Sequence, residues 1–282
     1  HIPKGSPLLE EFPNQIQFDP ITNQHILFKK PYILRALRDC GIEFTHPWSM
    51  GTGASDVVLV ESQIAKERMI ADGCPEEKIE LTGHASHDNL FNVHVNGHTL
   101  KTWLLKKYKL NKNKKFIVIA LPQLAEHNHL PWEEHWKEID FLCATMSELD
   151  ANVLISLHPR VKRYQYENLE TKHGIRILDE RVFEIIPVID LYLATFSSTV
   201  EWAVLSGVPA IVYDFYEYQY EVFEGLDSII VTEDKQKFID LVNSMINEDQ
   251  LLIEKKEEAA SDSHKMGVFD GKCLDRIIDQ LL

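Results

Sequence analysis

Residues 190–214 read DLYLATFSSTVEWAVLSGVPAIVYD, and this stretch decides the fold class. The apolar run at 190–194 predicts a buried strand, and the hydroxyl residues at 197–199 form a polar turn. Residues 200–205 then have helical character, a Ser-Gly pair ends the helix, and 208–213 begins a second buried strand. The pattern predicts a parallel strand–helix–strand unit, whose helix directs its first N–H groups at the carboxyl edge of the sheet.

The turn between strand and helix is rich in hydroxyl groups. Ser197, Ser198 and Thr199 place three hydrogen-bond donors at the start of the helix, where a phosphate group would fit. The alternative is that Ser198 or Thr199 only caps the helix, since helix N-caps are most often Ser, Thr, Asp or Asn. The turn alone leaves both interpretations open.

A second strand end carries groups that also suit an anion. Residues 151–157 read as a buried strand, and Pro159 stops it because proline has no N–H for a ladder. His158 and Arg160 then lie at the carboxyl end, where open α/β sheets bind their ligands. Together with the hydroxyl turn, these two residues predict an anion site. The alternative for His158 is a hydrogen bond to a nearby backbone group.

The two strand ends resemble a known pair of motifs. LHP at 157–159, followed by FSST at 196–199, resembles the HP and SS/T motifs of bacterial GT-B glycosyltransferases. The families concerned are the sialyl-, polysialyl- and Kdo-transferases, which use CMP-activated sugars. In those families the His and the hydroxyls contact the nucleotide phosphate. The resemblance implies a nucleotide or phosphate site made of His158, Arg160, Ser197, Ser198 and Thr199.

A broader resemblance covers roughly residues 50–282. Segments 56–62, 73–75 and 78–84 with Asp88 are similar to the end of the N-terminal domain of GT-B proteins. Segment 269–273 with Arg276 and Ile277 resembles the terminal helix of that superfamily, which includes the hydrolysing UDP-GlcNAc 2-epimerases.

The fold class implied by this resemblance is α/β and GT-B-like, with two Rossmann-like domains that have parallel sheets. We place a short or truncated, acceptor-side N-terminal domain at residues 1–95. A C-terminal nucleotide-sugar-binding domain follows at 112–282.

The sequence also departs from both kinds of relative. The 2-epimerases carry a Ser-Gly-Gly turn and an adjacent Glu pair where this chain has FSST and the single Glu201. Their His-Arg-Glu-Asn stretch has no clear match in residues 121–128, which counts against epimerase chemistry. The acidic-acidic-glycine motif that supplies the acceptor base in sialyltransferases is not found as such. The catalytic base therefore stays unassigned.

The loop after the strand at 116–121 should lie on the same edge as His158. Glu126 and His127 are candidate acid or base residues there, and Gln123 or Asn128 can bond a sugar or a base. The alternative is an ordinary polar loop. A metal site from the histidines of this region matches no zinc spacing, so we expect neither a metal nor a cofactor.

The segment after the strand at 208–213 is the other candidate for substrate contacts. Its aromatic residues, among them Tyr216, can stack on a base or sugar, and Asp214 can bond a ribose hydroxyl. The alternative is that the tyrosines pack the loop and expose their hydroxyls.

The composition narrows the functional class. The chain has 282 residues, enough for two modest α/β domains, and its 44% hydrophobic and 26% charged residues are ordinary for a globular protein. No apolar run reaches the roughly 18 residues of a membrane span, and no signal peptide is visible. The net charge of −15 argues against nucleic acid as a partner. Four scattered cysteines without a CxxC pattern predict reduced thiols in a cytoplasmic protein.

Residues 101–115 hold seven lysines. One interpretation is a basic face near a membrane, because anionic lipids attract such segments, which would give peripheral association with the inner face of the membrane. The other is a solvated linker between domains.

The sequence thus predicts a glycosyltransferase of surface polysaccharide or glycoconjugate biosynthesis. The donor would be a nucleotide-activated sugar, CMP-linked according to the resemblance, and the acceptor a glycan or a lipid-linked glycan. The alternatives are an NDP-sugar 2-epimerase-like enzyme and a non-catalytic module that binds a glycan or a partner. The sequence does not indicate an oligomeric state.

Overall fold

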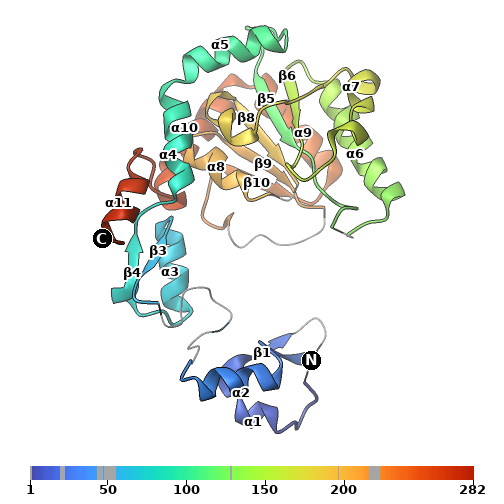
Figure 1. Cartoon of the computed structure of the whole chain (residues 1–282). Helices are drawn as coiled ribbons and strands as arrows, with labels where there is room; N and C mark the ends of the chain where they lie inside the picture. The colour runs from blue at the N-terminus through green and yellow to red at the C-terminus, as the bar shows by residue number, and fades with distance from the viewer. Residues whose placement is uncertain are drawn as a thin grey trace. The chain divides into compact units, whose positions relative to one another are not determined.

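The computed structural model describes residues 2–19, 23–42, 47, 55–127, 129–195, 197–215 and 223–282 (Figure 1). The chain divides into two compact units. Unit 1 is His1–His84 with Leu274–Leu282, and unit 2 is Ala85–Cys273.

Unit 1 contains a β-hairpin and a small parallel pair of strands. Strands β1 and β2 pair antiparallel, and β3 pairs parallel with β4. The helix between β3 and β4 begins after Ser62, whose hydroxyl accepts a hydrogen bond from the Ala65 N–H at 3.0 Å. The elements are α1 (Leu8–Glu11), a 3-10 helix (Pro13–Gln15), β1 (Ile16–Asp19), β2 (Gln24–Leu27), α2 (Pro31–Asp39), β3 (Val58–Val60), α3 (Gln63–Ala71), a 3-10 helix (Glu76–Lys78) and β4 (Ile79–Leu81), with α11 (Cys273–Asp279) near the end of the chain.

Unit 2 is built on a six-stranded sheet with the order β10-β9-β8-β5-β6-β7, and all its neighbouring strands run parallel. The strands are β5 (Phe116–Ala120), β6 (Asn152–Ser156), β7 (Arg176–Ile177), β8 (Leu191–Ala194), β9 (Ala210–Tyr213) and β10 (Ile229–Thr232). Ala120 pairs with both Ser156 and Ala194, so β5, β6 and β8 end at the same level. The loops that follow these three strands therefore emerge side by side.

Helices cover both faces of this sheet (Figure 1). They are α4 (Ala85–Val95), α5 (Gly97–Lys107), α6 (Trp132–Ser147), α7 (Asn168–His173), α8 (Thr199–Leu205), α9 (Lys235–Asn247) and α10 (Asp249–Met266), with 3-10 helices at Arg163–Gln165, Val182–Glu184 and Ile186–Val188. An apolar cluster joins α6 and α9 to the central strands, and its buried members include Ile139, Phe238, Ile155 and Ile211. Because both faces are buried, the strands are apolar almost throughout, as the sequence predicted.

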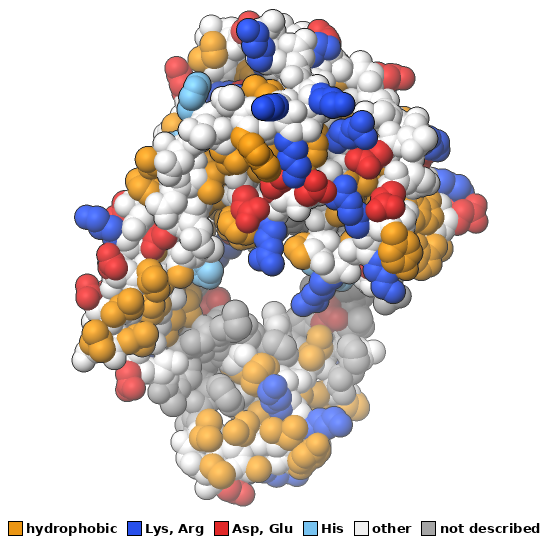
Figure 2. Space-filling view, turned by 45° about the horizontal axis from the view of Figure 1, so that its top comes forward, with side chains coloured by type: hydrophobic (Ala, Val, Ile, Leu, Met, Phe, Trp, Pro, Cys, Tyr) orange, Lys and Arg blue, Asp and Glu red, His pale blue; other side chains and the backbone are white. Residues whose placement is uncertain are grey.

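Part of the Lys-rich segment is helical. Residues 97–107 form α5, which belongs to unit 2. Within unit 2, Lys101 lies 3.4 Å from Asp190, and Lys107 lies 3.0 Å from Asp179 and also pairs with Glu180. Figure 2 shows Lys and Arg side chains interspersed with Asp and Glu side chains on one face of this unit.

Among the described residues, no helix is both long enough and apolar enough to cross a bilayer.

Candidate functional site

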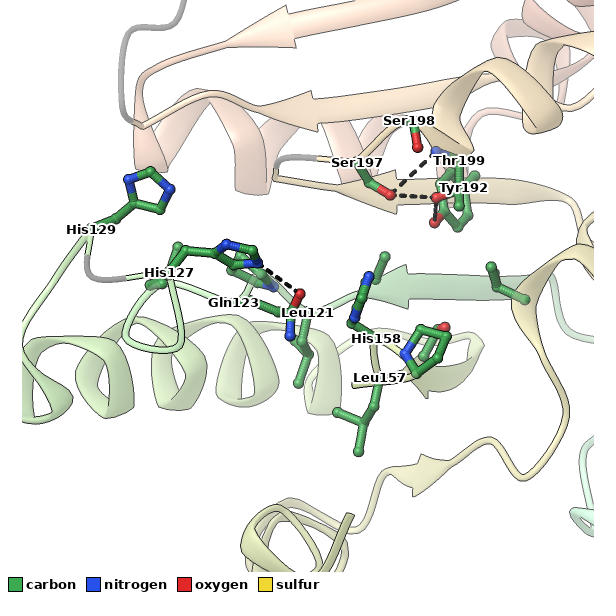
Figure 3. Close-up of a pocket in the computed structure, with 16 residues that line it drawn as sticks. Leu121, Gln123, His127, His129, Leu157, His158, Tyr192, Ser197, Ser198 and Thr199 are labelled. Atoms are coloured by element: carbon green, nitrogen blue, oxygen red, sulfur yellow. Dashed lines mark hydrogen bonds between the residues drawn. The ribbon is translucent and has the colours of Figure 1, made fainter. Parts of the chain in front are cut away.

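A cavity of about 280 Å³ opens at the carboxyl ends of β5, β6 and β8, inside unit 2 (Figure 3). Its apolar lining includes Leu121, Leu124, Leu157 and Val182, and its polar lining includes Gln123, His127, His158, Ser197, Ser198 and Thr199. The aligned strand ends account for this arrangement, since each of the three loops begins at the same edge of the sheet.

His158 is held by the turn that Pro159 imposes after β6. The backbone N–H of Arg160 donates to Nδ1 of His158 at 3.2 Å, so the neutral ring carries its proton on Nε2. Partial desolvation lowers the pKa of His158, and the charges of Arg160 and His127 lower this pKa further. A neutral imidazole that presents Nε2–H is therefore the form present at pH 7. The Arg160 side chain is exposed and is not part of the cavity lining.

The hydroxyl turn forms a short hydrogen-bond chain. Oγ of Ser197 lies 2.5 Å from Oγ1 of Thr199 and also accepts the Thr199 N–H at 3.3 Å. Ser198 occupies the N-cap position of α8, but its side chain makes no capping hydrogen bond and is exposed. Ser197 thus stabilises the turn itself, whereas the Ser198 hydroxyl is available to a ligand.

Tyr192 supports this turn from the strand below. Its hydroxyl lies 2.5 Å from Oγ1 of Thr199, and its side chain is fully buried in β8. Burial raises the pKa of Tyr192 to about 12, despite the opposing hydrogen bonds with Thr199 and Ser197. The hydroxyl therefore stays protonated and holds the Thr199 side chain. Tyr192 was not among the residues predicted from the sequence, although it is a single polar aromatic residue in an otherwise aliphatic strand.

The loop after β5 contributes a second imidazole. Nε2–H of His127 donates to Oε1 of Gln123 at 3.0 Å, and the two rings of His127 and His129 have centroids 6.0 Å apart. Glu126 is not among the residues that line the cavity; its Oε1 accepts a hydrogen bond from the Tyr166 hydroxyl at 2.7 Å. Asn128 lies outside the described residues.

Asp214 and Tyr216 are the two residues that the sequence suggested after β9. Asp214 is buried, its backbone N–H donates to the Thr232 carbonyl at 2.8 Å, and it does not line the cavity. Tyr216 lies outside the described residues. The cavity thus brings together Gln123, His127, His158, Ser197, Ser198 and Thr199, and its lining does not include Glu126, Arg160 or Asp214.

Asp88, Asp270 and Cys273 form a group with metal-ligand spacing among the described residues of unit 2. None of them lines the cavity. Oδ1 of Asp88 accepts the Cys273 N–H at 2.8 Å, and Oδ1 of Asp270 accepts the Lys272 N–H at 3.1 Å. The two carboxylates therefore bond backbone groups at the start of α11, which is a structural use of this group.

No family model matches this chain, and no curated protein matches it. Solved structures do. The wall teichoic acid polymerase TagF superimposes with a TM-score of 0.57 at 17% identity, over 95% of this chain and 63% of that chain. A variant of the same polymerase soaked with CDPG gives a TM-score of 0.54 at 16% identity, over 80% of this chain and 57% of that one.

A second group of similar structures consists of epimerases. The UDP-GlcNAc 2-epimerase from Neisseria meningitidis, bound to UDP-GlcNAc, has a TM-score of 0.56 at 16% identity, over 80% of this chain and 60% of that chain. This chain therefore spans less than two thirds of the length of these proteins. At such identities the likeness shows the fold, and it confirms the predicted α/β, GT-B-like fold class. The sialyl- and Kdo-transferase subtype stays a prediction.

Proposed function

We propose that this chain belongs to a glycosyltransferase of surface polysaccharide or glycoconjugate biosynthesis, and that its cavity holds the phosphate of a nucleotide-activated donor. One observation carries the proposal: His158, whose proton is on Nε2, and Ser198, whose side chain makes no capping hydrogen bond, line the same cavity from two different strand ends. Uncharged donors at fixed positions suit a phosphate oxygen. We propose that residues 112–282 bind the donor and that residues 1–95 bind the acceptor.

The same groups would act during transfer. Negative charge develops on the departing nucleotide, and fixed N–H and O–H donors stabilise such charge electrostatically. The exposed guanidinium of Arg160 adds a cation next to His158, because it already lowers the pKa of that ring through its charge. His127, held by Gln123, is the candidate acid or base in the cavity.

The donor base we propose is cytidine. The HP and SS/T resemblance supports it, and so does the likeness to a polymerase that was soaked with CDPG. A thermal-shift panel of CMP, CDP and UDP tests the choice, since a ligand that binds only the folded state raises its stability by mass action. We expect the cytidine nucleotides to raise the melting temperature most. Equal shifts, or a preference for UDP, would contradict the cytidine assignment.

A sugar-nucleotide 2-epimerase is the second candidate, because the fold also resembles epimerases bound to UDP-GlcNAc. The two candidates differ in their need for an acceptor. Release of free nucleotide only with an acceptor supports the transferase, whereas an acceptor-independent change of the sugar supports the epimerase. Binding without any turnover would instead indicate a non-catalytic module that binds a glycan or a partner.

The acceptor we propose is a glycan or a lipid-linked glycan, reached at the cytoplasmic face of the membrane. The Lys-rich segment 101–115 is the proposed contact with anionic lipid. Among the described residues, Lys106, Lys109 and Lys112 have no ion-pair partner, whereas the other four lysines pair with carboxylates. Flotation with phosphatidylglycerol vesicles tests this contact, and recovery equal to that with neutral vesicles would contradict it.

A further inference from the structure

Tyr166 is the centre of a buried polar cluster in unit 2. Its hydroxyl donates to Oε1 of Glu126 at 2.7 Å and accepts the Nε2–H of His135 at 2.9 Å. The Tyr166 side chain is 1% exposed, and its ring lies 4.9 Å from that of Trp136. The three polar residues come from three different places in the chain: the segment after β6, the loop after β5 and the first turn of α6.

The proton arrangement makes Tyr166 the connecting group. Oε2 of Glu126 and Nδ1 of His135 lie 3.9 Å apart, and both are buried without a hydrogen-bond partner among the described residues. Burial lowers the pKa of His135, against the opposing charge of Glu126, so its ring is neutral and Nδ1 carries no proton. Two hydrogen-bond acceptors that face each other do not attract. The loop is therefore tied to this cluster through Tyr166 and not through His135 directly.

The cluster belongs to the same chain segments as two residues that line the cavity. Glu126 precedes His127, which lines the cavity, and Tyr166 follows His158 by eight positions in the segment that leaves β6. The described residues of this loop, 121–127 and 129–130, form no helix or strand, so buried side-chain contacts such as the Glu126–Tyr166 hydrogen bond contribute to the position of the loop.

We infer that Tyr166 and Glu126 are positioning residues of the cavity, and that their hydrogen bond fixes His127 relative to His158. The consequence for ligand binding rests on the proposed function, whereas the positioning itself does not. In this arrangement the Glu126 carboxylate acts through the loop instead of touching the substrate. This role differs from the acid or base role that the sequence suggested for Glu126, and the two can be separated by experiment.

The first measurement needs no ligand. Imidazole signals of His127 and His158 are followed by ¹H–¹⁵N NMR in the full chain, with assignments from single His→Gln variants. Tyr166→Phe keeps the ring but removes both hydrogen bonds, and Glu126→Ala removes the acceptor. We expect both variants to shift the His127 signals. Tyr164→Phe is the matched control, because Tyr164 lies in the same segment and is 67% exposed. In this variant the His127 signals should match those of the unchanged protein.

Glu126→Gln separates positioning from catalysis. The Gln amide oxygen can still accept the Tyr166 proton, and its NH₂ group can donate to Nδ1 of His135. We therefore expect Glu126→Gln to keep the His127 signals, and also the turnover if the enzyme is assayed. Loss of turnover in Glu126→Gln with unchanged His127 signals would show a catalytic carboxylate and overturn the inference. If Tyr166→Phe fails to fold, the comparison of Glu126→Ala with Glu126→Gln still tests the inference.

The second measurement is CDP binding by calorimetry. We expect Tyr166→Phe and Glu126→Ala to weaken CDP on the order of ten-fold, as loss of a hydrogen bond behind a ligand group does in other sites. Folded Tyr166→Phe and Glu126→Ala proteins with unchanged His127 signals would overturn the inference. If the unchanged protein binds no CDP but the His127 signals shift as expected, the proposed function fails and the positioning role stands.

Discussion

The backbone N–H of Arg160 donates a hydrogen bond to Nδ1 of His158 at 3.2 Å. This contact uses the acceptor nitrogen of the imidazole and leaves the proton on Nε2, and His158 is one of the residues that line the cavity. The contact lies in a turn after β6 that contains Pro159, and in the same turn the Val161 N–H donates to the His158 carbonyl at 2.9 Å. His158 is thus prepared as a hydrogen-bond donor before any ligand binds.

His158→Ala should fold normally and lose nucleotide binding, because the exposed ring contributes its Nε2–H and no core packing. His158→Gln should retain part of the affinity, since its amide nitrogen can replace Nε2–H. Calorimetry with CDP measures both variants, with denaturant melts as the check on folding. Unchanged affinity in a folded His158→Ala protein would remove His158 from the site.

The three hydroxyls of the turn should separate into structural and ligand-binding groups. Ser197→Ala removes the acceptor of the Thr199 N–H and should cost about 1 kcal/mol of stability, as other helix-start residues do. Ser198→Ala should change stability by less than about 0.5 kcal/mol, because its exposed side chain makes no capping bond.

The effect of Ser198→Ala on nucleotide binding should be larger than its effect on stability. A hydroxyl that donates to a charged phosphate contributes about 1.5–3 kcal/mol. Denaturant melts and nucleotide titrations of Ser197→Ala and Ser198→Ala test this division. If Ser198→Ala lowers stability and leaves affinity unchanged, the turn is structural only.

Tyr192 and Thr199 should be energetically coupled. Thr199→Val leaves the buried Tyr192 hydroxyl without this partner and should cost about 1–3 kcal/mol. Adding Tyr192→Phe removes the orphaned hydroxyl, so the double variant should be more stable than the sum of the single variants predicts, by about 0.5–3 kcal/mol. Urea unfolding of the four proteins measures the coupling, and strict additivity would contradict the hydrogen bond.

The central strands could be predicted because their signal is local. The strand expected at 151–157 is β6 at Asn152–Ser156, and that expected at 190–194 is β8 at Leu191–Ala194. Strands that are buried on both faces are apolar throughout, so their ends are visible in the sequence. The placement of His158 and the hydroxyl turn at one edge followed from those ends.

Other features depend on contacts between distant residues. Helix α5 was missed because its lysines suggested a solvated segment, whereas Lys101 pairs with Asp190, 89 positions away. The Tyr166–Glu126 hydrogen bond spans 40 positions and depends on side-chain packing. Periodicity and propensity carry no information about such pairs, so Glu126 could only be assigned a generic acid or base role.

His135 should make the protein less stable as the pH falls. Burial lowers its pKa in the folded state below the ordinary value of about 6.5, and the facing groups, Glu126 and Tyr166, leave this direction unchanged. The unfolded chain therefore binds more protons below about pH 6.5, and the stability contributed by neutral His135 is lost as the pH falls toward its folded pKa.

His135→Gln should reduce this dependence, because the amide can donate to Tyr166 but does not titrate. Urea unfolding at pH 7.5 and 5.5 measures the free energy of unfolding of both proteins. The pKa of His158 is also lowered, but His158 is present in both proteins, so its contribution cancels in the difference between them. We expect the unchanged protein to lose more stability than His135→Gln over this range. Equal losses would mean that burial does not lower the pKa of His135 in the folded state.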